Sequence, residues 1–243
     1  MRRAFTFAVL LTVAAPYGAL GQQVSPALRF RIRAWPDAAV LGTSLAAALV
    51  PTVWSNSFAH ATCAPCDPAR LPGLDRGTVG PVRAAADAFS TGTLVTEAAL
   101  GAVFLASSRR GQGAAFVEDA TVIAQAVTLT AAATAWAKVL FHRPRPYLYL
   151  PGAAAPSADD GRSMPSSHTS VAFAAAAAYA SILQRRGLAR SHAAQIGVLF
   201  GVAAVTGALR VVAHKHFPTD VAAGAALGFT IGWVFPRIHA TEP

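Results

Sequence analysis

The sequence has few charged residues and only two cysteines in a chain of 243 residues. Lys, Arg, Asp and Glu together make up 13% of it, whereas hydrophobic residues make up 54% and the mean hydropathy is +0.44. This balance is too apolar for an ordinary soluble domain, and the length fits a single domain. We therefore expect an integral membrane protein in a bilayer. A soluble all-helical protein with buried helices is the alternative.

The chain also lacks a Gly-rich phosphate-binding loop, a low-complexity segment and a basic stripe with interleaved aromatic residues. The formal net charge is +9, but the basic residues are scattered between apolar runs. Such scattered charges are typical of the flanks of membrane segments and do not indicate a nucleic-acid partner.

The first residues have the pattern of a secretory signal. Arg2 and Arg3 form a basic region, Ala4 to Ala15 form an apolar region, and Ala19-Leu20-Gly21 is a small-x-small cleavage site. We predict a signal peptide over residues 1–21 and one helical domain over residues 22–243. An uncleaved first membrane helix is the alternative.

Six apolar segments follow, and they are long, rich in Ala and Leu, and free of the period-two alternation of half-buried strands. Several are shorter than the roughly 20 residues that cross a bilayer, so some must extend into flanking polar residues. We predict an all-α, six-helix transmembrane bundle. The segments are Ala38 to Trp54, Phe89 to Ser107, Ala120 to Phe141, Thr169 to Leu183, Ala193 to Val212 and Val221 to Pro236.

Cys63 and Cys66 lie in the loop TCAPCDP, between the first two apolar segments. There is no second cysteine pair to complete a four-sulfur zinc centre. We predict a disulfide between them, because an exported face permits oxidation. A free thiol pair and a CxxC redox role are the alternatives.

Three polar clusters lie at segment ends, and they share one face of the bundle if the segments alternate in direction. In the first, Pro144 and Pro146 cannot continue a helix, so we expect Arg145 in a loop folded back toward Lys138. The two cations could then converge on one anion. Alternatively, both extend to the lipid headgroups.

The second cluster, Ser166-Ser167-His168, precedes an apolar helix. A helix start offers backbone N–H groups and a positive dipole end to a phosphate, and His168 is a candidate proton donor. Plain helix capping is the alternative.

The third cluster contains Arg210, His214, His216 and Asp220. An ionised Arg210 at the end of an apolar segment is costly unless it has a partner or a function. Asp220 could hold His216 in one tautomer and strengthen its other nitrogen as a nucleophile. A helix N-cap role for Asp220 is the alternative, and both roles can coexist. Together, the three clusters are typical of phosphoryl transfer, in which positioning and charge neutralisation dominate.

The order Lys-x6-Arg-Pro, Pro-Ser-x-His and Arg-x5-His-x3-Asp, from Lys138 to Asp220, resembles the three-part signature of the type 2 phosphatidic acid phosphatase superfamily. That superfamily also includes vanadium haloperoxidases and bacterial class A acid phosphatases. The resemblance implies that Lys138, Arg145 and Arg210 bind phosphate and that no metal or other cofactor is needed. Ser166 and Ser167 would bind phosphate oxygens through hydroxyl and main-chain groups.

The resemblance also implies that His216 attacks phosphorus to give a phosphohistidine, with Asp220 orienting it. His168 would protonate the leaving alcohol and later activate water. His214 stands two residues from His216 and would be a rim residue. Two positions depart from the signature: Ser167 replaces its usual Gly, and Leu209 replaces a Ser that usually precedes the Arg. A Ser at a backbone position that needs a positive φ would carry a steric cost.

These observations favour a membrane phosphatase that hydrolyses a lipid phosphate monoester or pyrophosphate. An exported soluble class A-type acid phosphatase, a vanadate-dependent haloperoxidase and an inactive lipid-phosphate binder remain open. The sequence does not identify the lipid, which could be phosphatidate, phosphatidylglycerol phosphate, undecaprenyl pyrophosphate or a lipid A phosphate.

The arginines of the loops opposite the three clusters indicate the orientation. By the positive-inside tendency, these loops are cytoplasmic and the catalytic face is periplasmic, in a bacterial-type inner membrane. A cleaved signal peptide with six full crossings would reverse that face. One possible resolution is that Ala38 to Trp54 does not span. The arginines are Arg109, Arg110, Arg185, Arg186 and Arg190, and Arg29, Arg31 and Arg33 agree with them.

Overall fold

The computed structural model describes residues 28–54, 61–154, 157–239 and 241–242. The predicted signal peptide, residues 1–21, lies outside the described residues. The long helices are α1 (Ala34–Val53), α4 (Ala84–Ser108), α5 (Gly113–Phe141), α6 (Ser167–Arg185), α7 (Ala193–Val212) and α8 (Pro218–Ile238). The short elements are β1 (Arg29–Phe30), η1 (Pro68–Arg70), α3 (Gly73–Arg76), η2 (Pro146–Tyr149) and β2 (Thr241–Glu242).

The predicted all-α bundle is confirmed, because each predicted apolar segment corresponds to one long helix. Several helices begin earlier than their apolar run. Helix α4 starts five residues before Phe89 and α5 starts seven before Ala120, because Asp87 and the pair Glu118–Asp119 interrupt the apolar runs but not the helices. In the described part of the chain, β1 and β2 form an antiparallel pair that brings Arg29 opposite Glu242.

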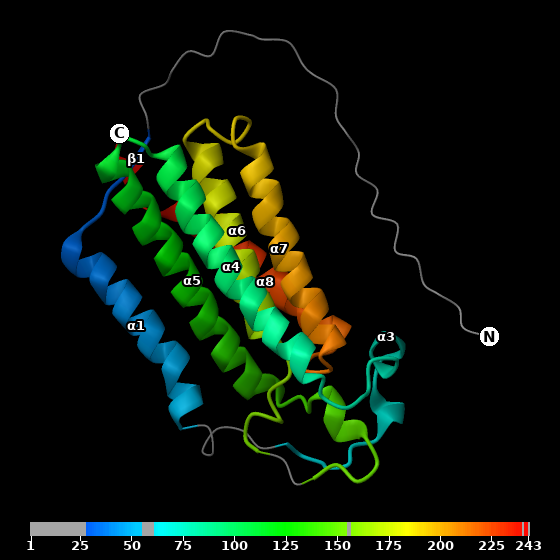
Figure 1. The fold of residues 1–243 in the computed structure, drawn as a ribbon. Helices are drawn as coiled ribbons and strands as arrows, with labels where there is room; N and C mark the ends of the chain where they lie inside the picture. Colours follow the sequence, from blue (N-terminus) through cyan, green and yellow to red (C-terminus); the bar gives the residue numbers. More distant parts are fainter. Residues whose placement is uncertain (1–27, 55–60, 155–156, 240, 243) are drawn as a thin grey trace.

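Successive long helices run in opposite directions (Figure 1). The ends of α1, α5 and α7 and the starts of α4, α6 and α8 therefore lie at one end of the bundle. The loop that holds α3 and the long loop after α5 lie at that end, and the β1–β2 pair lies at the other (Figure 1). The three polar clusters of the sequence thus share one end of the molecule.

Five helical segments among the described residues are long and apolar enough to cross a membrane. They comprise α1, α4, α5 together with η2, α7 and α8. Helix α6 is not among them, because Ala and the polar residues at its two ends make it less apolar. It lies inside the bundle, with every residue from Ala176 to Leu183 buried. The outer helices expose large apolar side chains such as Trp35, Leu140 and Ile238. A bilayer would cover these side chains.

Helices α6 and α8 pack with their backbones close together. Gly224, Gly228 and Gly232 lie one turn apart on α8 and face Ser166, Ser170 and Ala174 of α6. A Cβ at Gly224 would lie 2.7 Å from the Ser166 carbonyl oxygen, and one at Gly228 would overlap the carbonyl of Ser170. Small residues at four-residue spacing permit such close approach between membrane helices. The contact fixes the start of α6 against the start of α8.

A network of buried ion pairs stabilises the opposite end of the bundle. Arg109 Nε donates to Asp119 at 2.6 Å, and Arg186 pairs with Asp119 at 2.6 Å and with Glu118 at 3.0 Å. Arg29 of β1 joins the network through Glu118 at 3.0 Å. Buried charges are costly unless they are paired, and these pairs connect α4, α5, α6 and β1.

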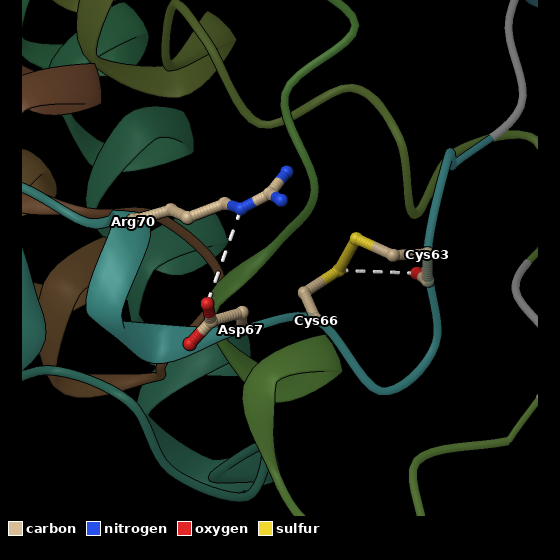
Figure 2. Close-up of a disulfide and its surroundings, with 4 residues drawn as sticks. All are labelled: Cys63, Cys66, Asp67 and Arg70. Atoms are coloured by element: carbon tan, nitrogen blue, oxygen red, sulfur yellow. Dashed lines mark hydrogen bonds and ion pairs between the residues drawn. A yellow bond between two sulfur atoms is a disulfide. The ribbon is translucent and has the colours of Figure 1, made fainter.

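The structure contains a disulfide between Cys63 and Cys66, close to an ion pair between Arg70 and Asp67 at 3.9 Å (Figure 2). The Cys66 amide donates to the Leu148 carbonyl at 2.8 Å, which ties this loop to η2. Formation of the disulfide in the cell stays a prediction.

Replacing Gly228 by Ala tests the contact between α6 and α8. The added methyl group would overlap the Ser170 carbonyl, and overpacking of this kind costs about 1–3 kcal/mol of unfolding free energy. We expect a lower thermal unfolding midpoint for Gly228→Ala in detergent. Gly197→Ala on α7 is the matched control, since a Cβ there meets nothing within 4 Å. Equal midpoints for the two variants would contradict this account of the contact.

Candidate active site

A polar cavity of about 520 Å³ opens at the end of the bundle where the three clusters meet. Of the residues predicted from the sequence, six line it, and they come from the end of α5, the start of α6, the end of α7 and the loops next to them. These six are Lys138, Arg145, Ser167, His168, Arg210 and His216. The cavity therefore brings together residues from all three motifs.

The three predicted phosphate-binding cations are largely buried at this cavity, each at most 8% exposed. Lys138 Nζ donates to the Arg162 carbonyl at 2.6 Å. Arg145 pairs with Asp159 at 2.8 Å, while Arg210 pairs with Asp87 and donates to Ser90 Oγ at 3.0 Å. Since each head group is held by protein oxygens, the three positive charges are fixed around one space.

His216 lies in the turn between α7 and α8 and is buried. Its Nδ1 is 3.6 Å from Asp220 Oδ2, and its Nε2 is 3.3 Å from Arg145 Nη1. A guanidinium can only donate, so Nε2 accepts and the ring proton belongs on Nδ1, beside the carboxylate. Burial lowers the pKa of His216 well below its ordinary value, and the cations of Lys138, Arg145 and Arg210 lower it further. The ring is therefore neutral, with a lone pair on Nε2.

Asp220 is fully buried and accepts hydrogen bonds on both oxygens. Oδ2 accepts from the Phe217 amide at 2.8 Å and from the Ser163 hydroxyl, whereas Oδ1 accepts from Arg143 Nη1 at 2.5 Å. The bond to Phe217 caps the start of α8. The two roles considered for Asp220, helix capping and orientation of His216, are thus compatible in one geometry.

Arg143 was not assigned a role from the sequence, yet it connects two buried carboxylates. Its Nη2 donates to Asp75 at 2.7 Å, and its Nη1 donates to Thr219 Oγ1 at 2.6 Å as well as to Asp220. The guanidinium also lies 4.4 Å from the centre of the Phe217 ring. Arg143 therefore fixes Asp220 from the side opposite His216.

The second cluster divides into residues that reach the cavity and one that does not. His168 Nε2 is 3.2 Å from Thr91 Oγ1 of α4, and Ser167 begins α6 beside it. Ser166 instead lies in the contact with α8, where its amide donates to the Asp220 carbonyl at 3.0 Å. The Ser166 N–H group is therefore already used in this structure, and the contact of Ser166 with phosphate stays a prediction.

His214 and His216 contact different parts of the molecule, because both follow the end of helix α7. Helix α7 ends at Val212, and His214 adopts a positive φ of 55° in the following turn. Its ring packs on Gly80, and its Nδ1 lies 2.8 Å from the Pro81 carbonyl oxygen. His214 contacts the loop before α4 and is not among the residues that line the cavity.

The cavity also contains residues that sequence reasoning did not single out. They lie on α1, α4 and α5 and in the loops after α5 and α7, and none of them belongs to the three motifs as predicted. Lys215 follows Arg210 by five residues in the sequence, but it does not occupy a position of any of the three motifs. These residues are Pro51, Thr52, Asp87, Thr91, Ala135, Asp159, Arg162 and Lys215.

A sequence model of the PAP2 superfamily matches residues 119–243, which include all three motifs. The chain belongs to the PAP2 superfamily. A solved structure described as the first transmembrane PAP2 type phosphatidylglycerolphosphate phosphatase, from Bacillus subtilis, is similar at 19% identity and a TM-score of 0.46. The similarity covers 84% of this chain and 95% of that one. A search of curated proteins found no match.

The PAP2 superfamily assignment confirms the resemblance drawn from the motifs and supports a membrane phosphatase. The matched range begins within α5. Helices α1 and α4 and the loop with α3 lie outside it, although they contribute Asp75, Asp87 and Thr91 to the site or its support.

We predict that Arg143 is a positioning residue in this PAP2 site. Arg143→Lys keeps a positive charge but cannot bridge Asp75 and Asp220 with a planar fork. Loss of such a supporting contact costs about 10–100-fold in activity, and we expect it to lower kcat for phosphate release with little change in KM. Steady-state kinetics on a soluble phosphate ester would measure this.

Arg76→Lys, in α3, is a control, because its guanidinium donates only to the backbone carbonyls of Leu71 and Ala69 among the described residues. An unchanged kcat in Arg143→Lys would contradict the positioning role.

Proposed function

We propose that this protein is a membrane phosphatase that hydrolyses a phosphorylated lipid through a phosphohistidine at His216. The observation that carries the proposal is the neutral His216 ring, whose Nε2 lone pair lies among buried cations while its Nδ1 lies beside Asp220. That arrangement suits attack on an anionic phosphorus, since the cations offset the charge of phosphate.

In the first step, His216 Nε2 would form a bond to phosphorus while the bond from phosphorus to the lipid oxygen breaks. Lys138, Arg145 and Arg210 would neutralise the equatorial oxygens, and the first turn of α6 at Ser167 would add amide groups at a positive dipole end. His168 would give its proton to the leaving oxygen, and the Nδ1 proton of His216 would stay on the ring, facing Asp220 Oδ2 at 3.6 Å.

In the second step, His168 would accept a proton from water as the water oxygen attacks phosphorus. The bond between phosphorus and Nε2 then breaks, which returns His216 to its neutral form and releases inorganic phosphate. Thr91 supports His168 at 3.2 Å and favours a ring orientation that faces the cavity.

A lipid substrate is favoured over a soluble one by the surroundings of the cavity. The cavity lies at the ends of helices whose outer faces are apolar, and α1 and α4 both contribute to its wall. A phosphate at the headgroup plane could enter it from the bilayer while its chains remain in hydrocarbon. The exposed apolar side chains of these helices do not favour the exported soluble alternative.

Trapping of the intermediate tests this function. We expect the wild-type protein to release phosphate from 4-nitrophenyl phosphate and from at least one lipid of a panel of phosphatidate, phosphatidylglycerol phosphate, undecaprenyl pyrophosphate and lipid A. His216→Ala should abolish both release and the acid-labile phosphoenzyme, because the nucleophile is gone. Quenching with labelled substrate and measuring protein-bound phosphate would detect it.

His214→Ala is the matched control for that experiment and should keep most activity, because His214 contacts Gly80 and Pro81 away from the cavity. Full activity in His216→Ala together with loss in His214→Ala would refute the assignment of the nucleophile.

We further propose that the catalytic end faces the periplasm of a bacterial-type inner membrane. The Cys63–Cys66 disulfide at this end suits an oxidising compartment. The short loops at the other end carry Arg110, Arg185 and Arg190, which suit the cytoplasm.

This orientation conflicts with cleavage of the predicted signal peptide. Helix α1 is 20 residues long and is apolar enough to cross the membrane, so the proposed resolution in which Ala38 to Trp54 fails to span is not favoured. When α1 crosses, β1 and the catalytic end lie on opposite sides. A chain cut near Gly21 would leave β1 in the periplasm, so a periplasmic catalytic end requires that residues 1–21 are not removed by export.

Cysteine labelling decides the orientation. In a Cys63→Ser/Cys66→Ser background, a membrane-impermeant thiol reagent added to intact spheroplasts should label Ser157→Cys, in the loop after α5, and not Arg110→Cys. Both should react after permeabilisation. Labelling of Arg110→Cys alone in intact spheroplasts would place the catalytic end in the cytoplasm.

A further inference from the structure

A second cavity of about 370 Å³ lies between α4, α5 and α6, on the membrane side of the polar one. Its wall is almost entirely apolar and includes Leu94, Ala98, Val127 and Val171. These residues continue the helix faces that carry Thr91, Ala135 and His168 at the polar cavity. We call this space, at Leu94 to Leu105 of α4 and the facing parts of α5 and α6, the apolar groove.

One carboxylate interrupts the apolar groove. Glu97 of α4 lines it and is 2% exposed, and neither of its side-chain oxygens has a hydrogen-bond partner among the described residues. A buried polar group without a partner is costly. An ionisable residue inside a membrane bundle that has no structural partner indicates a ligand.

The position of Glu97 relates it to the catalytic residues. Thr91, which contacts His168, precedes Glu97 by six residues on α4, a rise of about 9 Å along the helix axis. A lipid whose phosphate lies at His168 and His216 would extend its chain along the apolar groove and pass Glu97. Whether ionised or neutral, the carboxyl oxygens of Glu97 accept hydrogen bonds.

We propose that Glu97 is a specificity residue that accepts a hydrogen bond from a hydroxyl or amide N–H group on the hydrocarbon part of the lipid substrate, next to its head group. This rests on the proposed lipid phosphatase function. It assigns the substrate to phosphorylated lipids with hydroxylated or amide-linked chains, and not to those whose chains are hydrocarbon alone. A lipid chain without such a donor leaves the Glu97 carboxyl group desolvated and unpaired. A site built for a hydrogen bond rejects a substrate of that kind strongly.

Matched lipids test the proposal. The purified protein would be assayed in nanodiscs with phosphatidic acid carrying 3-hydroxymyristoyl chains, with phosphatidic acid carrying myristoyl chains, and with 4-nitrophenyl phosphate. We expect the wild type to prefer the hydroxylated lipid and Glu97→Leu to lose at least about tenfold in kcat/KM for that lipid alone. Glu97→Gln should keep part of the preference, because its amide oxygen still accepts. Hydrolysis of 4-nitrophenyl phosphate should be unchanged in both variants.

Thr96→Leu is the control, since Thr96 is exposed, its hydroxyl donates to the Gly92 carbonyl and it does not line the groove.

Binding of the two lipids to the His216→Ala protein, which should not hydrolyse them, separates the role of Glu97 from the proposed phosphatase function. Native mass spectrometry would measure this binding. Preferential binding of the hydroxylated lipid that is lost in Glu97→Leu would support the role of Glu97. Absence of phosphate release from the wild-type protein would refute the proposed function only, and not this role. Equal binding of both lipids, or equal loss for both in Glu97→Leu, would overturn the role of Glu97.

Discussion

The close contact between α6 and α8 is the constraint on which the active site depends. With no side chain at Gly224 and Gly228, the backbone of α8 approaches that of α6 closely enough for the Ser166 amide to bond the Asp220 carbonyl at 3.0 Å. That bond joins Ser166, two residues before His168, to Asp220, which faces His216. A wider spacing would move His168, the proposed general acid, away from His216, the proposed nucleophile, although neither side chain is among the atoms nearest to these glycines.

Charge is the second constraint, since the described cavity wall contains five cationic side chains and two carboxylates, Asp87 and Asp159. Burial of unbalanced like charges is unfavourable. The two carboxylates offset part of this by pairing with Arg210 and Arg145. A phosphate dianion would offset two of the three remaining positive charges, so the excess of positive charge at this end suits binding of an anion. The ion pairs of Arg109 and Arg186 at the opposite end are balanced by contrast, which suits a purely structural role.

Much of this arrangement could be predicted from the sequence, because the apolar runs fix the helices and the three motifs stand at helix ends. The alternation of helices then brings Lys138, His168 and His216 to one end without further information. Other residues could not be found in this way. Asp87 and Thr91 lie in an apolar helix with no motif, and Arg143 shares its motif with Arg145, so only three-dimensional packing shows that Arg145 lines the cavity and that Arg143 supports Asp220.

The structure accommodates the two departures from the superfamily signature, Ser167 and Leu209. Ser167 begins α6 without a positive φ, so a side chain there carries no backbone strain, and the residue lines the cavity. Leu209 lacks the hydroxyl that a Ser would offer, but Ser90 of α4 accepts from Arg210 at 3.0 Å from a buried position. The hydroxyl contact to this arginine is therefore made from another helix. Since those two positions were the observations behind an inactive lipid-phosphate binder, this geometry removes the support for that alternative and is consistent with the proposed hydrolysis.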